Sequence, residues 1–198
     1  GQKWFGFEDY IEEFATLPLD PAFVEEKLDM ESFIDYYVFS EFITARDNRW
    51  NNLFMSISAE NNKLMVTPWD LDMTFGSVWT GDLPYLTKTD FEEMPELYAK
   101  ADDPFFINRL VHHHKDFKKR AGQRYFQLRE DLWSEEKILG KIQYYQNFLR
   151  DTGIYERDLT RWPSSPKITP GREDFISEFI VKKMDLLDEI YENVLSED

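Results

Sequence analysis

Two short stretches of the sequence alternate in the way that β-strands do, and they lie close together in the first half of the chain. They span residues 53–58 and 63–67, and the mostly polar residues 59–62 separate them. Two short strands joined by a four-residue polar turn predict a β-hairpin. Elsewhere apolar residues recur at the three- and four-residue spacing of helices. The sequence therefore predicts a mainly α fold with one small β-hairpin.

The helices that precede the hairpin have recognisable start signals. Asp20 followed by Pro21 is typical of an N-cap with proline at the first helical position, and Asp29 begins a second helix. We expect that second helix to end near residues 44–46, which leaves Asp47 in the loop just beyond it. Further helices are predicted at about residues 90–100, 103–113, 115–131, 135–160 and 171–196, with an irregular loop over 77–89 and a helix start at Thr169-Pro170.

Composition limits the class of protein. A chain of 198 residues with 42% hydrophobic and 17% aromatic residues is expected to fold as a single domain over residues 1–198. Its net charge of -16 disfavours binding to nucleic acid or to an anionic membrane. The absence of cysteine excludes disulfides and thiolate zinc sites. No apolar run reaches the ~18 residues of a membrane span.

The hairpin gathers carboxylate and amide side chains at its open end. If the turn is centred on Asn61, facing residues have numbers that sum to about 122, so Asn52 is predicted to face Asp70. If the chain stays extended, Asp72 lies two residues further on the same side, because side chains alternate with a period of two. Asp47 lies in the approach loop, five residues before Asn52. The spacing therefore predicts a cluster of four oxygen-bearing side chains.

Such a cluster suits Mg²⁺, Mn²⁺ or Ca²⁺ rather than zinc, because these cations prefer hard oxygen ligands. A carboxylate left free of the metal could orient a hydroxyl group for phosphoryl transfer. The alternative is local, since Asp and Asn also form turns and helix caps. With 39 acidic residues in the chain, an Asp-x-Asp pair alone does not decide between the two.

Two longer strings carry a resemblance to a known family. The string MESFIDYYVFSEFITARDNRWNN leads into the hairpin and VTPWDLDMTFG follows it. A helix, an Asp-Asn-x-x-x-Asn segment, strands and then Pro-Trp-Asp-x-Asp resemble the spore coat protein H (CotH) kinase family. The match is strongest over about residues 29–76. The same order of elements occurs in the protein-kinase catalytic loop and its metal-binding Asp.

The resemblance implies roles for four residues. Asp47 matches the catalytic Asp that contacts the acceptor hydroxyl, and Asn52 and Asp70 match the residues that hold the nucleotide and its metal. Asp72 is the expected second ligand beside Asp70. The implied cofactors are ATP with Mg²⁺ or Mn²⁺, and the implied partner is a protein that presents Ser or Thr. The family also implies export to the cell envelope or surface.

One part of a kinase-like enzyme has no counterpart here. Such enzymes need an N-terminal lobe with a strand lysine on the nucleotide phosphates, whereas residues 1–46 are predicted to be helical and contain no Gly-rich loop. We expect this chain to be the C-terminal lobe of a longer protein, and inactive on its own. Two alternatives remain open: a non-catalytic surface or coat adhesion or assembly module with a vestigial cation site, and a small-molecule or sugar phosphotransferase.

Two further features have competing interpretations. Trp50 and Trp69 flank the predicted site and could stack on a substrate, although aromatic residues beside a hairpin more often belong to a core. Residues 115–129 form the one basic stretch, which predicts a solvated helix face that could attract an acidic segment of a partner.

Overall fold

The computed structural model describes residues 19–49, 51–72, 74–76, 106–163 and 173–197. Within these parts the chain is mostly helical with one two-stranded antiparallel sheet, as the sequence predicts. The elements are α2 (Pro21–Lys27), α3 (Met30–Ile43), the 3₁₀ turn η1 (Asp47–Arg49), β1 (Leu53–Ile57), β2 (Leu64–Pro68), α5 (Phe106–His113), α6 (Phe117–Glu130), α7 (Glu135–Asp151), α8 (Ile154–Arg161) and α9 (Glu173–Ser196). The predicted loop 77–89, the helix 90–100 and the Thr169-Pro170 helix start lie outside the described residues.

The predicted starts of α2 and α3 are confirmed by their caps. The Oδ1 atom of Asp20 accepts a hydrogen bond from the backbone N–H of Ala22 at 2.9 Å, and Oδ1 of Asp29 accepts one from Ser32 at 3.2 Å. Helix α3 is followed by its C-cap residue Thr44, whose backbone is left-handed with φ 52° and ψ 52°. This reversal turns the chain out of the helix and into η1, which begins with Asp47.

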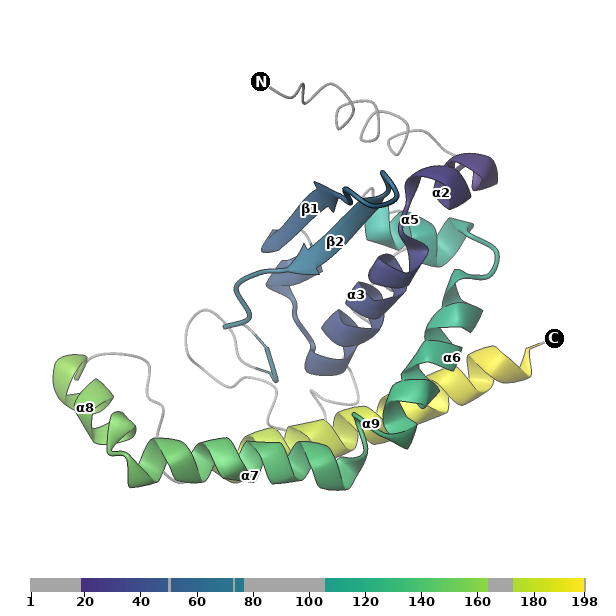
Figure 1. The fold of residues 1–198 in the computed structure, drawn as a ribbon. Coiled ribbons are helices and arrows are strands. Elements are labelled where there is room, and N and C mark those ends of the chain that lie inside the picture. The colour runs from purple at the N-terminus through teal and green to yellow at the C-terminus, as the bar shows by residue number, and fades with distance from the viewer. Residues whose placement is uncertain (1–18, 50, 73, 77–105, 164–172, 198) are drawn as a thin grey trace, which may run out of the picture.

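Helix α3 forms the centre of the core. It lies between the hairpin on one side and helices α6 and α9 on the other, while α7 runs beside α9 (Figure 1). Ten of the fourteen residues of α3 are buried, so nearly its whole circumference is covered. Leu64 and Val66 of β2 are buried in the same core as α3, and the N–H of Asp29 donates to the carbonyl oxygen of Leu64 at 2.9 Å. The hairpin is therefore fixed against the helix that leads into the Asp47 loop.

The hairpin is confirmed, but its predicted register is wrong by one residue. Leu53 pairs with Pro68, and Ile57 pairs with Leu64, so the facing residue numbers sum to 121. The N–H of Ser58 donates to the carbonyl oxygen of Lys63 at 2.8 Å and closes the turn over residues 59–62. A four-residue turn is centred between its second and third residues, not on Asn61 as predicted.

The sequence also predicts one helix over residues 135–160 where the structure has two. Helix α7 ends at Asp151 and α8 begins at Ile154, and Gly153 between them has a φ of 65°. A positive φ interrupts right-handed helical geometry and is easily adopted by glycine, which has no Cβ. Trp162 follows the end of α8, in the gap predicted between the helices 135–160 and 171–196.

Candidate functional site

The loop after α3 brings Asp47 and Asn52 together. The Nδ2 atom of Asn52 donates to Oδ2 of Asp47 at 2.6 Å, and Nδ2 of Asn51 donates to Oδ1 of Asp47 at 3.3 Å. The backbone N–H of Asn51 also donates to the carbonyl oxygen of Asp47 at 2.9 Å. The short bond to Asn52 turns the amide nitrogen of that residue towards Asp47. Its amide oxygen Oδ1 therefore takes no part in the bond to Asp47.

Asn48 joins this loop to the hairpin, although the sequence patterns assign it no role of its own. Its side chain is buried, and Nδ2 donates to the carbonyl oxygens of Asn52 at 2.6 Å and of Trp69 at 2.8 Å. Its own carbonyl oxygen accepts a bond from the hydroxyl of Tyr36 at 2.6 Å. Burial raises the pKa of Tyr36 well above its usual range, so the phenol remains a donor even at alkaline pH where a solvated tyrosine ionises. Asn48 adjoins Asp47 in sequence, but only the fold reveals that it bridges two segments.

Asp70 and Asp72 follow β2 in a turn that is attached at both ends. At one end the N–H of Trp69 donates to the carbonyl oxygen of Asn52 at 2.8 Å, so Trp69 occupies the place predicted for Asp70. At the other end the N–H of Phe75 donates to the carbonyl oxygen of Ile43, the last residue of α3, at 2.7 Å. Asp70 is therefore one residue beyond the position opposite Asn52.

The carboxylates of this turn are open to solvent. Asp70 and Asp72 are exposed, and neither has a hydrogen-bond or ion-pair partner within the described residues. Asp70 has a φ of 52°, a left-handed conformation that Asp tolerates better than most residues. The described part of the chain contains no group of three or more His, Cys, Asp or Glu side chains that could hold a metal ion. Asp47, Asp70 and Asp72 therefore do not form such a group, and a cation site that uses Asn52 and Asp70 stays a prediction.

An exposed aromatic pair adjoins the site. Trp69 and Phe54 are 59% and 55% exposed, and their ring centroids lie 5.2 Å apart in an edge-to-face arrangement. The interpretation of Trp69 as a core residue is therefore wrong. Its main chain is held by Asn48 and Asn52 while its indole faces solvent. Trp50 lies outside the described residues.

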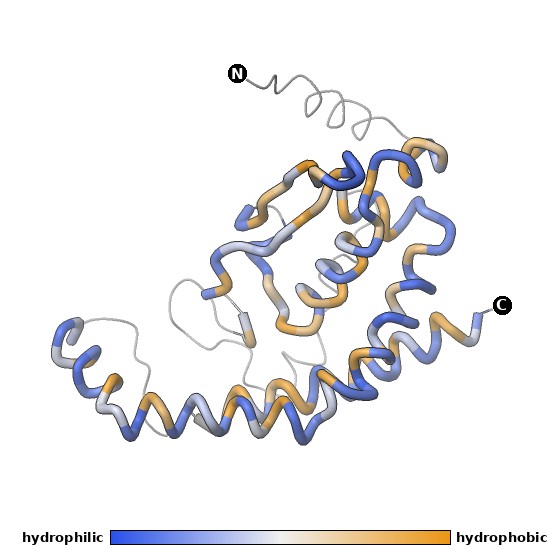
Figure 2. The backbone as a smooth tube through the Cα atoms, viewed as in Figure 1, coloured by the Kyte–Doolittle hydropathy of each residue, from blue (hydrophilic) through white to orange (hydrophobic). Residues whose placement is uncertain are grey.

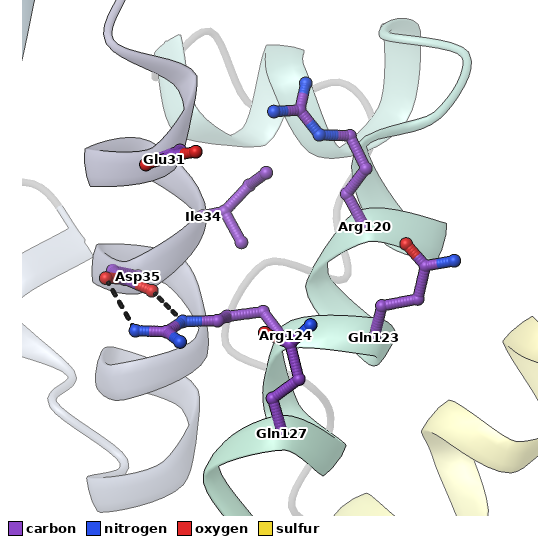
Figure 3. Close-up of a pocket in the computed structure, with 7 residues that line it drawn as sticks. All are labelled: Glu31, Ile34, Asp35, Arg120, Gln123, Arg124 and Gln127. Carbon is purple, nitrogen blue, oxygen red and sulfur yellow. Dashed lines mark hydrogen bonds and ion pairs between the residues drawn. The ribbon is translucent and has the colours of Figure 1, made fainter.

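Two residues of the basic stretch, Arg124 and Arg129 on α6, join helices. Lys115 and Lys119, in contrast, are exposed as the predicted solvated face requires. Arg124 forms two hydrogen bonds with Asp35 of α3, at 2.6 and 3.2 Å, across a polar pocket of about 330 Å³ (Figure 3). The hydrogen bond to Asp35 raises the pKa of Arg124. Arg129 makes a similar pair with Asp188 of α9, where two bonds measure 3.1 and 3.0 Å. None of the candidate site residues lines the pocket in Figure 3.

Comparison with known proteins identifies the family to which these features belong. A family model described as CotH kinase protein matches residues 2–187, and thus covers the α3 loop, the hairpin and most of α9. Neither the curated proteins nor the solved structures contain a match to the chain. None of the helices in the described residues combines the length and hydrophobicity needed to cross a membrane.

Proposed function

This chain belongs to the CotH kinase protein family, and from that premise we propose that it supplies the acidic part of a kinase-like site that transfers the γ-phosphoryl group of ATP to a Ser or Thr hydroxyl. In this proposal its helices and hairpin correspond to the C-terminal lobe of a protein kinase. The observation that carries the proposal is the 2.6 Å hydrogen bond from Nδ2 of Asn52 to Oδ2 of Asp47. This bond engages the amide nitrogen of Asn52 and leaves its amide oxygen for a cation. We propose that the acceptor hydroxyl belongs to a surface or coat protein.

Asp47 is assigned to the acceptor hydroxyl. One of its oxygens accepts the short bond from Asn52, and each carboxylate oxygen has lone pairs for a further donor. Asp47 orients the hydroxyl and takes its proton as the acceptor oxygen bonds to the γ-phosphorus and the bond to the β-phosphate oxygen breaks, which releases ADP. Positioning and charge neutralisation supply most of the rate in such reactions.

Asn52 and Asp70 are assigned to the metal, with Asp72 in support. Bound Mg²⁺ or Mn²⁺ neutralises charge on the phosphate oxygens. Asn52 offers Oδ1 because its nitrogen is engaged with Asp47, and Asp70 offers an exposed carboxylate without an ion-pair partner in the described residues. The bonds from Asn48 to Asn52 and Trp69 fix the main chain next to both ligands.

The aromatic pair is assigned to the nucleobase. Trp69 directly precedes Asp70, and its N–H donates to the carbonyl oxygen of Asn52. Phe54 lies two residues after Asn52, and its exposed ring packs on the exposed ring of Trp69. Stacking on a base is sequence-tolerant and contributes roughly 1–3 kcal/mol per base in other proteins. A platform at this place would hold the base while the neighbouring carboxylates meet the metal and phosphates.

The test uses the full-length protein with ATP, Mg²⁺ or Mn²⁺ and a library of Ser and Thr peptides. Asp47→Ala and Asp70→Ala are each expected to lower phosphotransfer by about 10²–10⁴-fold, since each removes a positioned charge from the reacting groups. Asp158→Ala on α8 is the matched control, because Asp158 is an exposed acid outside the site. Wild-type rates in both site variants, or no ATP binding by the intact protein, would contradict the proposal.

A further inference from the structure

Two opposite charges are buried together in the core, between α3 and α9. Nζ of Lys183 in α9 lies 3.7 Å from Oε2 of Glu41 in α3, and the two side chains are only 2% and 1% exposed. Most of their buried neighbours are apolar, although Ser40 and Thr44 beside Glu41 are buried polar residues. The apolar neighbours are Val38, Phe42 and Ile43 on α3, and Phe179, Ile180, Met184 and Leu187 on α9. The ion pair is therefore embedded where two hydrophobic surfaces meet.

An apolar pair of similar volume would stabilise such an interface at least as well, because burial removes water from both charges. What an ion pair adds is a geometric requirement. Apolar side chains tolerate small shifts of one helix along another, whereas two buried charges are compensated only when their atoms come close together. The pair thus specifies one position of α9 along α3.

That position bears on both segments of the candidate site. Glu41 is in the last turn of α3, and its carbonyl oxygen accepts a bond at 3.2 Å from the N–H of Thr44, where the chain turns towards Asp47. Four residues before Lys183 in α9, Phe179 packs edge-to-face on Phe75 with ring centroids 6.3 Å apart. Phe75 belongs to the segment that follows Asp70.

The next residue shows how close this packing is. Gly76 has a φ of 80°, and a Cβ atom there would lie 3.1 Å from Phe175 and 3.2 Å from Phe179. A side chain at Gly76 would therefore displace the Asp70 segment from α9. Helix α9 therefore supports both segments of the site. Lys183 contacts Glu41 near the end of α3 that leads to Asp47, and Phe175 and Phe179 pack against the segment that follows Asp70.

We propose that Lys183 and Glu41 are positioning residues. Their ion pair fixes α9 on α3, and this holds the Asp47–Asn52 loop at a constant distance from the segment carrying Asp70. The inference rests on the proposed function for its meaning. It can be tested without an activity assay, because the NMR resonance of the Asn52 side-chain amide reports on its hydrogen bond to Asp47.

The experiment compares the Glu41→Leu/Lys183→Met double variant with wild type in the full-length protein, labelled with ¹⁵N-asparagine. We expect a urea midpoint at or above the wild-type value, together with a shift of the Asn52 side-chain amide resonance towards that of a free amide. We also expect kcat to fall about tenfold or more with little change in KM for ATP, since small displacements of reacting groups are costly. The charge-exchanged variant Glu41→Lys/Lys183→Glu should recover the Asn52 resonance.

Asp35→Asn/Arg124→Gln is the matched control, because it removes another α3 ion pair, at the exposed pocket of Figure 3. It should leave the Asn52 resonance unchanged. If the apolar double variant does not fold, Glu41→Gln replaces it with the same expected shift. An unchanged Asn52 resonance in a folded variant would overturn the inference. Loss of kcat with an unchanged resonance would also overturn it, whereas an inactive wild type would count against the proposed function alone.

Discussion

Helices α3 and α7 are of similar length but occupy opposite environments. Ten of the fourteen residues of α3 are buried, whereas none of the seventeen residues of α7 is fully buried. Figure 2 shows hydrophobic positions recurring along α7 between hydrophilic ones. Yet α7 exposes large aromatic side chains, with Tyr144 at 64%, Tyr145 at 61% and Phe148 at 47%.

The difference in burial shows which of the two helices belongs to the core. Helix α3 is enclosed by the hairpin, α6 and α9, and it delivers the Asp47 loop from the centre of the core. Helix α7 contacts α8 and α9, and it borders an apolar hollow of about 310 Å³ together with Phe42 and Phe75. We therefore expect substitutions on α3 to change folding and site together, and substitutions on the outer face of α7 to change neither.

The largest effect is expected for a matched pair of phenylalanines. Phe33→Ala on α3 removes a fully buried ring and should lower the free energy of unfolding by about 3–5 kcal/mol. Phe148→Ala on α7 removes a ring that is 47% exposed and should change it by less than about 1 kcal/mol. Urea unfolding followed by circular dichroism measures both, and equal losses would show that α7 is part of the same core.

The next effect concerns Asn48. Asn48→Ala removes both bonds from Nδ2 and leaves the carbonyl oxygens of Asn52 and Trp69 without this donor, which should cost about 1–3 kcal/mol. Asn51→Ala is the control, because its exposed side chain makes only a 3.3 Å bond to Asp47. Urea unfolding measures the free energy of unfolding of both variants. Equal effects at the two positions would contradict the role assigned to Asn48.

A smaller effect with a distinct pH dependence is expected for Tyr36. Tyr36→Phe removes its bond to Asn48 and should cost about 0.5–1.5 kcal/mol at neutral pH. Because burial raises the folded pKa above the ordinary value of about 10, the native chain keeps its proton while the unfolded chain loses it, so stability falls as pH rises above that value.

The variant should therefore lose less stability than wild type between about pH 8 and pH 10.5, measured by urea midpoints. Part of the alkaline loss remains, since burial also raises the pKa of Tyr125, with a further contribution from its hydrogen bond to Asp188. Parallel pH profiles for wild type and Tyr36→Phe would show that Tyr36 is not the buried phenol responsible.

The smallest effect compares two helical glycines. Gly140 of α7 has no atom within 4 Å of where a Cβ would lie, so Gly140→Ala should stabilise the chain by roughly 0.5–1 kcal/mol. Gly122 of α6 is packed, with Tyr191 at 3.3 Å and Leu195 at 3.4 Å from that point, so Gly122→Ala should gain less or be destabilising. Thermal unfolding measures both changes. A larger gain at Gly122 would reverse the expected contrast.

The elements that could be predicted from the sequence are those with local signals. Asp20 and Asp29 cap their helices through hydrogen bonds two and three residues away, and the polar turn at 59–62 defines a hairpin. The register was wrong by one residue because the turn has an even number of residues, so its centre falls between two of them.

Other features depend on contacts between distant segments. Asp47 and Asn52 belong to one loop, and the sequence predicted that they lie close together. The hydrogen bond from Asn48 to Trp69, in contrast, joins residues that are 21 positions apart in the sequence. The burial of Lys183 against Glu41 joins α9 to α3 and has no local pattern at all. The metal and catalytic roles of Asp47, Asn52, Asp70 and Asp72 remain predictions.

Paramagnetic relaxation by Mn²⁺ tests the central claim most directly. Mn²⁺ and ATP are added to the ¹⁵N-asparagine-labelled full-length protein, in which Asn52 reports on the site and Asn147 reports on α7. The account predicts selective broadening of the Asn52 side-chain amide, unaffected Asn147 signals, and loss of the effect in Asp70→Asn. Broadening that spreads evenly to Asn147, or that persists in Asp70→Asn, would mean that Mn²⁺ binds the acidic surface in general and would contradict the account.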